Sequence, residues 1–162
     1  MPTQKPGRHS STVRPHMEPH AFIEGHEQVL ARFGQWPSFH DGEIHRLLLD
    51  STRRDANGRR YPSIEVDLRG WIMTNEVTEQ GFYRCEFDSV VRFLFEHVSS
   101  VELDGLNHQN VLSCLGLELL AVEAGSSQLK VELEHCFGLS GSFIAGKASV
   151  VSVTPYVAAS AS

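Results

Sequence analysis

The pattern of apolar and polar positions divides the chain into one helical stripe followed by a series of strand-like segments. Apolar residues recur at spacings of three, four and seven between His20 and Phe33, which predicts an amphipathic helix. Gly34 is well placed to end this helix, and Pro37 prevents its continuation. We therefore expect one helix near the N-terminus, packed on the elements formed by the rest of the chain.

The remaining pattern predicts a sheet. In residues 63–73 and 128–136, apolar and charged side chains alternate with the period of a half-buried strand. Residues 55–58 (Asp-Ala-Asn-Gly) predict a hairpin turn, and residues 74–83 have the polar composition of a loop. The other strand candidates are residues 43–50, 90–98, 101–106, 111–122 and 142–153. This succession predicts an α+β domain in which one N-terminal helix packs on a mostly antiparallel sheet of six or seven strands.

Length and composition indicate one folded domain with short tails. The chain has 162 residues, of which 41% are hydrophobic and 21% charged, and this suits a single domain with its own core. Residues 1–19 contain several prolines and no hydrophobic periodicity, so we predict a disordered tail there. We place the domain at residues 20–156 and expect residues 157–162 to be frayed.

The net charge indicates which kinds of partner to expect, and the cysteine spacing indicates the redox environment of the protein. The formal net charge of −6 argues against binding to nucleic acid or to an anionic membrane, both of which need a basic surface. It suits a basic partner, although a modest negative charge is also an ordinary way to stay soluble. The three cysteines are widely spaced with no Cys-x-x-Cys pair, which indicates reduced thiols. With no signal-peptide core and no apolar run of membrane-spanning length, we expect a cytoplasmic protein.

The stretch His40-Asp41-Gly42-Glu43-Ile44-His45 has the densest concentration of reactive side chains. If it continues into a strand, Asp41, Glu43 and His45 share one face and could bind a divalent cation such as Mn²⁺, Fe²⁺ or Zn²⁺. The alternative is a structural role, in which Asp41 caps backbone N–H groups and His40 is held by hydrogen bonds beneath Trp36 and Phe39. Trp36 is either a core residue or an interface anchor.

Two further segments combine glycine or amide side chains with apolar flanks. In residues 106–110 (Leu-Asn-His-Gln-Asn), Asn107 and Asn110 are candidates for left-handed backbone and for hydrogen bonds to loop backbone groups, and a polar recognition loop that includes Gln109 is the alternative. In residues 137–143 (Phe-Gly-Leu-Ser-Gly-Ser-Phe), Gly138 and Gly141 predict positive φ angles or a bulge.

Common enzyme signatures are absent from the sequence. There is no Gly-rich phosphate loop, no Gly-x-Ser-x-Gly turn and no His-Glu-x-x-His helix. His135 and Cys136 are adjacent in a predicted strand, so their side chains point to opposite faces and cannot form a catalytic pair. We therefore predict a protein that is not an enzyme and carries no cofactor or metal.

Three segments together resemble a family of small bacterial proteins classed as predicted immunity proteins, the fiftieth family of that catalogue, which are encoded beside polymorphic toxins. Residues 36–43 (Trp-Pro-Ser-Phe-His-Asp-Gly-Glu) resemble the family's WPSFHDxE motif. Residues 106–110 resemble its FNxQN-like element, with Leu106 in place of an aromatic residue. Residues 137–143 resemble its YGLSGSF bend, with Phe137 in place of tyrosine.

The resemblance implies an immunity-like protein that neutralises a cognate toxin by stoichiometric occlusion. Many such toxins are nucleases with basic clefts, which an acidic inhibitor complements. The candidate partner-binding or motif residues are Trp36, His40, Asp41, Glu43, Asn107, Gln109 and Asn110. Two alternatives stay open: a small metal-dependent hydrolase that uses Asp41, Glu43 and His45, and a generic interaction domain. The sequence does not indicate the oligomeric state.

Overall fold

The computed structural model describes residues 17–160. Most of the predicted N-terminal tail, residues 1–16, and the last two residues lie outside this range. The described chain begins with a short 3-10 helix, η1 (Pro19–Phe22), and the helix α1 (His26–Phe33). Six strands follow: β1 (Glu43–Arg54), β2 (Arg60–Val77), β3 (Tyr83–Asp104), β4 (Val111–Ala121), β5 (Ser127–Phe137) and β6 (Ser140–Pro155). A 3-10 turn, η2 (Glu123–Gly125), links β4 to β5.

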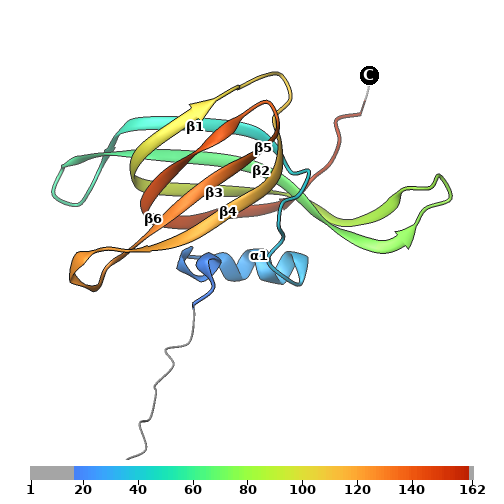
Figure 1. Cartoon of the computed structure of the whole chain (residues 1–162), viewed down its shortest axis with the longest axis horizontal. Helices are drawn as coiled ribbons and strands as arrows, with labels where there is room; N and C mark the ends of the chain where they lie inside the picture. Colours follow the sequence, from blue (N-terminus) through green and yellow to red (C-terminus); the bar gives the residue numbers. More distant parts are fainter. Residues whose placement is uncertain (1–16, 161–162) are drawn as a thin grey trace, which may run out of the picture.

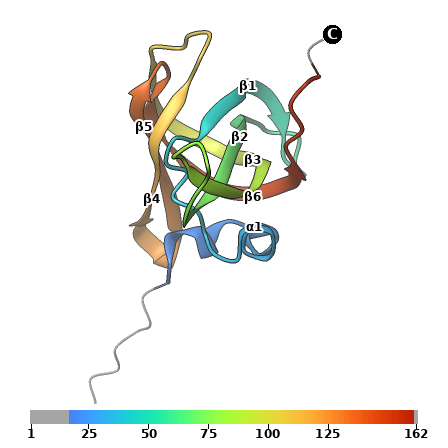
Figure 2. The ribbon, with the colours of Figure 1, turned by 90° about the vertical axis from the view of Figure 1, so that its right-hand side faces the viewer.

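All strand pairs are antiparallel, and the sheet closes on itself in the order β1-β2-β3-β6-β5-β4 (Figures 1 and 2). Strands β1–β3 and β4–β6 are each three consecutive strands joined by hairpins. These two units meet at two seams. The β3–β6 seam is a long ladder from Ser89↔Pro155 to Asp104↔Ser140. The β1–β4 seam has one pair of partner residues, Glu43↔Val111.

The core fills the closed sheet and the space beneath α1, which lies across the outside of the sheet in both views (Figures 1 and 2). Alternate residues of the strands point inward, as the sequence pattern predicts for residues 64–68 and 129–133. Helix α1 packs on β6 and β3 through Val29 and Phe33. Aromatic rings continue from Phe33 through Phe39 to Phe93 in edge-to-face contacts with centroid distances of 6.1–6.4 Å.

The coarse prediction of an N-terminal helix and a mostly antiparallel sheet is confirmed, with six strands. The label α+β fits only loosely, because the single α-helix has eight residues. The predicted helix from His20 is wrong at its start: Gly25 adopts φ 79° and separates η1 from α1. Gly34 ends α1 at φ 77°, as predicted.

Two predictions about the strands are also wrong. Residues 90–98 and 101–106 are not separate strands, because β3 runs without interruption to Asp104 and bends where His97 and Ser100 adopt positive φ angles. Residues 74–83 are not a plain loop, since β2 extends to Val77 and β3 starts at Tyr83. These ends form a hairpin that projects from the closed sheet, drawn in green at the right of Figure 1.

Among residues 17–160, no helix has the length and apolar character needed to cross a membrane. Residues 157–160 follow β6 without regular secondary structure.

Candidate functional site

The three motif segments, which are far apart in the sequence, meet at the β1–β4 seam. The N–H of Ile44 donates to the carbonyl oxygen of Asn110 at 2.8 Å. The N–H of Leu112 donates to the carbonyl oxygen of Gly42 at 2.8 Å. The N–H of Asp41 donates to the carbonyl oxygen of Leu112 at 2.9 Å. These backbone hydrogen bonds close the sheet next to the pair Glu43↔Val111. The first motif therefore serves to dock the start of β1 on the start of β4.

The side chain of Asn110 connects the second motif to the third. Its Oδ1 accepts hydrogen bonds from the N–H of Asn107 at 2.9 Å and from the N–H of Leu139 at 3.0 Å. Its Nδ2 donates to the carbonyl oxygen of Asn107 at 2.8 Å. Asn110 is buried and all of these contacts are to backbone. The predicted role for its amide is confirmed, although neither Asn107 nor Asn110 has a positive φ angle.

Glycine is required in the third motif because the backbone passes close to the second. Gly138 has φ 78°, and a Cβ there would lie 2.4 Å from the carbonyl oxygen of Gln109. Gly141 has φ 140°, and a Cβ there would meet the carbonyl oxygen of Glu102. The predicted positive φ angles are confirmed. Both glycines allow the β5–β6 connection to reach neighbouring strands.

The turn between α1 and β1 is strained, and it places the motif side chains differently from the prediction. Phe39 and Asp41 have φ angles of 58° and 60°, and the Phe39 ring is buried against Gly70. His40 does not lie beneath Trp36: its side chain is 65% exposed, and its Nδ1 lies 3.1 Å from Asp41 Oδ2. The imidazole that stacks on the half-buried Trp36 belongs to His20, with ring centroids 4.9 Å apart.

The alternative of a metal site at Asp41, Glu43 and His45 lacks the necessary geometry. Asp41 lies in the turn, and a register shift at His45 interrupts the start of β1, so the three do not alternate along a regular strand. Glu43 contacts His45 at 3.5 Å and approaches Arg69 at 4.0 Å. Within residues 17–160, no three His, Cys, Asp or Glu side chains are grouped closely enough to hold a metal ion.

The remaining candidate residues differ widely in exposure. Asn107 and Gln109 are exposed, and Asp41 and Glu43 are half-buried. Beyond the seam, β1 and residues 106–110 diverge and leave a cleft of about 620 Å³ lined by Glu43, His45, Leu106 and Asn107 among others. This cleft brings predicted residues of the first two motifs together on the surface, whereas the half-buried Trp36 lies outside it and the buried Asn110 reaches only its wall.

The strands β1, β2 and β3 carry a network of paired charges. Arg92 donates through Nε and Nη2 to the two carboxylate oxygens of Asp67 at 2.7 and 2.8 Å. Hydrogen bonding from Arg92 lowers the pKa of Asp67, and the same pair raises the pKa of Arg92. Arg69 is paired in the same way with Asp88 at 2.9 and 2.7 Å. Asp67 and Asp88 on this side of the molecule therefore have arginine partners.

The outer face of β4 and β5 carries carboxylates without such partners. Glu118 lies opposite Lys130, Glu132 opposite Gly116, and Glu134 opposite Cys114. Among the described residues, none of these three carboxylates has a Lys, Arg or His nitrogen within 4.0 Å. A hollow of about 210 Å³ lies between them. Burial raises the pKa of the Cys114 thiol, and the nearby Glu134 and Glu132 raise it further.

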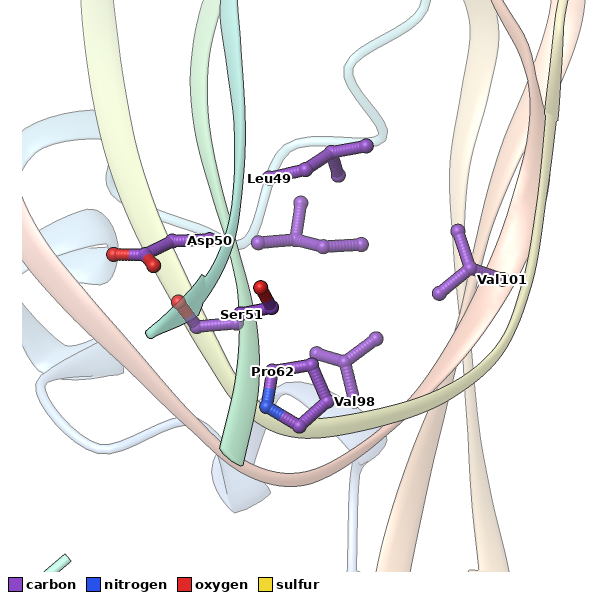
Figure 3. A pocket seen from close by; sticks show the side chains of 8 residues that line it. Leu49, Asp50, Ser51, Pro62, Val98 and Val101 are labelled. Atoms are coloured by element: carbon purple, nitrogen blue, oxygen red, sulfur yellow. The ribbon is translucent and has the colours of Figure 1, made fainter. Parts of the chain in front are cut away.

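An apolar hollow of about 280 Å³ lies at one end of the closed sheet (Figure 3). Leu49 of β1 and Val101 of β3 point toward it from opposite walls, and Pro62 and Val98 line its floor. Leu49 is 57% exposed and Val101 44% exposed. No polar side chains converge in it in the manner of a catalytic site.

The feature that sequence reasoning missed is the projecting β2–β3 hairpin, residues 71–87, called here the arm. It has several of the most exposed large apolar side chains of the described chain: Met73, Val77, Phe82 and Tyr83. The signal was present in the sequence as apolar and aromatic residues on both sides of a Gly-containing turn, but the polar residues between them indicated a loop.

Comparison of the chain with protein-family models, with curated proteins and with solved structures gave no match.

Proposed function

We propose that this chain is an immunity-like protein, which binds a cognate bacterial toxin one-to-one and occludes its active site or substrate channel. The observation that carries the proposal is a group of three carboxylates without cationic partners on one outer face of the sheet. Glu65, Asp67 and Asp88 on β2 and β3 are paired with arginines, whereas Glu118, Glu132 and Glu134 on β4 and β5 have no such partners among the described residues. A group of unpaired carboxylates attracts a basic partner and raises its association rate.

The motif residues support a binding protein more than an enzyme. Asn110 and Gly138 contribute to the contacts at the seam, and Gly141 allows β6 to approach β3, so a structural role accounts for these motif residues. The exposed members of the set, His40, Asn107 and Gln109, form no catalytic grouping. A protein of this kind needs no cofactor.

The test is binding of the purified protein to the product of the adjacent upstream gene, the position in which immunity genes of this family have their toxins. We expect a one-to-one complex with nanomolar Kd, loss of toxin activity on binding, and an association rate that falls as salt is raised. Replacement of Glu132 and Glu134 by Gln should lower the association rate about tenfold at low salt and leave the dissociation rate nearly unchanged.

A matched control is Glu24→Gln with Glu27→Gln, which removes the same charge at exposed positions beside and within α1. This control should change the association rate less than the strand-face variant does. An association rate that is insensitive to salt and to both double variants would contradict a role for the acidic face. Absence of any complex would contradict the proposed function itself.

A further inference from the structure

The arm is a two-stranded hairpin without support from the rest of the sheet. The last pair between β1 and β2 is Glu43↔Arg69, and the first pair between β3 and β6 is Ser89↔Pro155. Between these points β2 and β3 pair only with each other, from Ile72↔Glu86 to Val77↔Tyr83. Both outer edges of the arm are therefore unpaired within the described chain. An isolated two-stranded hairpin is marginally stable in water.

The arm exposes apolar side chains that folding alone does not require. Phe82 is 71% exposed, Val77 62%, Tyr83 58% and Met73 50%. Several exposed apolar side chains on one projecting element are typical of a protein-binding site. Aromatic residues are also enriched among the side chains that contribute most to binding energy.

Contacts at the base of the arm fix its direction. The Arg69 guanidinium lies 3.7 Å from the ring centroid of Tyr156 and 5.4 Å from that of Trp71, while it is paired with Asp88. On the other side, Arg32 of α1 donates to Ser89 Oγ at 2.8 Å. A hairpin whose base is held in this way has fewer orientations to lose when it docks, which favours binding.

A hollow of about 240 Å³ with a mixed polar and apolar lining lies at the base of the arm. His40, Trp71 and Met73 line it together with Gln35 and Ser38. Ser38 and His40 are thus residues of the first motif that reach the arm. The hollow would accept a side chain of a partner whose cleft surrounds the hairpin.

The net charge of the arm indicates what kind of partner it binds. The arm carries Glu76, Glu79 and Glu86 against a single cation, Arg84, which contacts Glu76 at 3.4 Å and Glu86 at 3.7 Å. The net negative charge complements a basic cleft. Two copies of this chain that paired arm to arm would instead bring carboxylates together, which is unfavourable.

We propose that the arm and the hollow at its base form the docking surface for a basic protein partner, with Phe82 and Tyr83 inserted into the partner's cleft. This inference rests on the proposed function and specifies the contact surface. In this arrangement the carboxylates of β4 and β5 govern the rate of encounter, and the arm governs how long the complex lasts.

The experiment measures binding of the full chain to the upstream gene product by surface plasmon resonance. Phe82→Ser with Tyr83→Ser should weaken binding about 100-fold, mainly through a faster dissociation rate, as expected for anchors at the centre of an interface. Leu49→Ser is the matched control, since Leu49 is 57% exposed in the hollow at the end of the sheet. We expect the control to bind as the wild type does. Thermal unfolding of each variant reports whether the fold is kept.

The outcomes separate the two proposals. If the wild type binds and the arm variant binds equally well with the same dissociation rate, the docking surface is wrong while the proposed function stands. If the wild type does not bind, both are wrong. If light scattering shows a wild-type dimer that the arm variant converts to a monomer, the arm docks on a second copy and the inference is overturned. A Trp71→Ala variant with unchanged melting should lose affinity, since Trp71 lines the hollow; unchanged affinity would show that the hollow is not part of the docking surface.

Discussion

Replacement of Asn110 by alanine tests whether the motif residues serve the fold. The substitution removes two acceptor contacts and one donor contact of the buried amide. Leu139 is 1% exposed, and its N–H then loses the acceptor that Asn110 provides, which lowers the free energy of unfolding by about 1–3 kcal/mol. The two backbone groups of exposed Asn107 can return to water, so their loss costs about 1 kcal/mol together. We expect a total destabilisation of about 3 kcal/mol.

The assay is thermal unfolding by circular dichroism or calorimetry. A loss of about 3 kcal/mol in a domain of this size lowers Tm by about 10 °C. Asn107→Ala is the matched control because it makes the same chemical change three residues away at an exposed position, and we expect its Tm to fall by no more than about 2 °C. A Tm for Asn110→Ala within about 2 °C of the wild type would refute the seam argument, and lost partner binding with unchanged melting would make Asn110 a contact residue.

Two further substitutions test the close approach at the third motif and the charge network. Gly141→Ala would place a Cβ against the carbonyl oxygen of Glu102 at φ 140°, so it should lower the free energy of unfolding by at least about 3 kcal/mol. Gly81→Ala, at φ 85° in open space, should lower it by about 1 kcal/mol. Equal urea midpoints for the two variants would contradict this reasoning. Asp67→Asn should cost about 1–2 kcal/mol at pH 7 because the pKa of Asp67 is lowered by Arg92 in the fold. A carboxyl pKa that is lowered in the folded protein stabilises the fold at pH values above the ordinary carboxyl pKa near 4, and this stabilisation is lost as the pH falls through the pKa of the folded state. The difference in Tm between variant and wild type should therefore shrink below about pH 4. A difference independent of pH would show that the ion pair is not its cause.

The parts of the fold that depend on local pattern could be predicted from the sequence. The alternation in residues 64–68 and 129–133, the helix end at Gly34 and the turn at residues 55–58 are all set by neighbours in the chain. The start of the helix was missed because Gly25 fits the helical stripe but adopts a positive φ angle. The arm was missed because a hairpin exposed on both faces has no alternation of apolar and polar positions to reveal it.

The site could be predicted only in part, because its arrangement depends on long-range register. The sequence indicates that Asn110 satisfies backbone groups, but it does not reveal that Leu139 supplies one of them. It could not show that His20 rather than His40 stacks on Trp36, since that choice depends on how η1 packs beside the turn. The separation of paired and unpaired carboxylates likewise appears only when the strand order is known.

The unequal lengths of the two seams have a consequence for motion in the native state. The β3–β6 seam is a long ladder, whereas the β1–β4 seam depends on one strand pair, a few flanking backbone hydrogen bonds and Asn110. Local opening occurs where the fewest interactions must break, so the two three-stranded units separate first at β1–β4. Such an opening uncovers the edges of β1 and β4 and keeps most of the sheet intact. Exchange of the amide protons of Ile44 and Leu112 with solvent therefore reports this local motion rather than global unfolding.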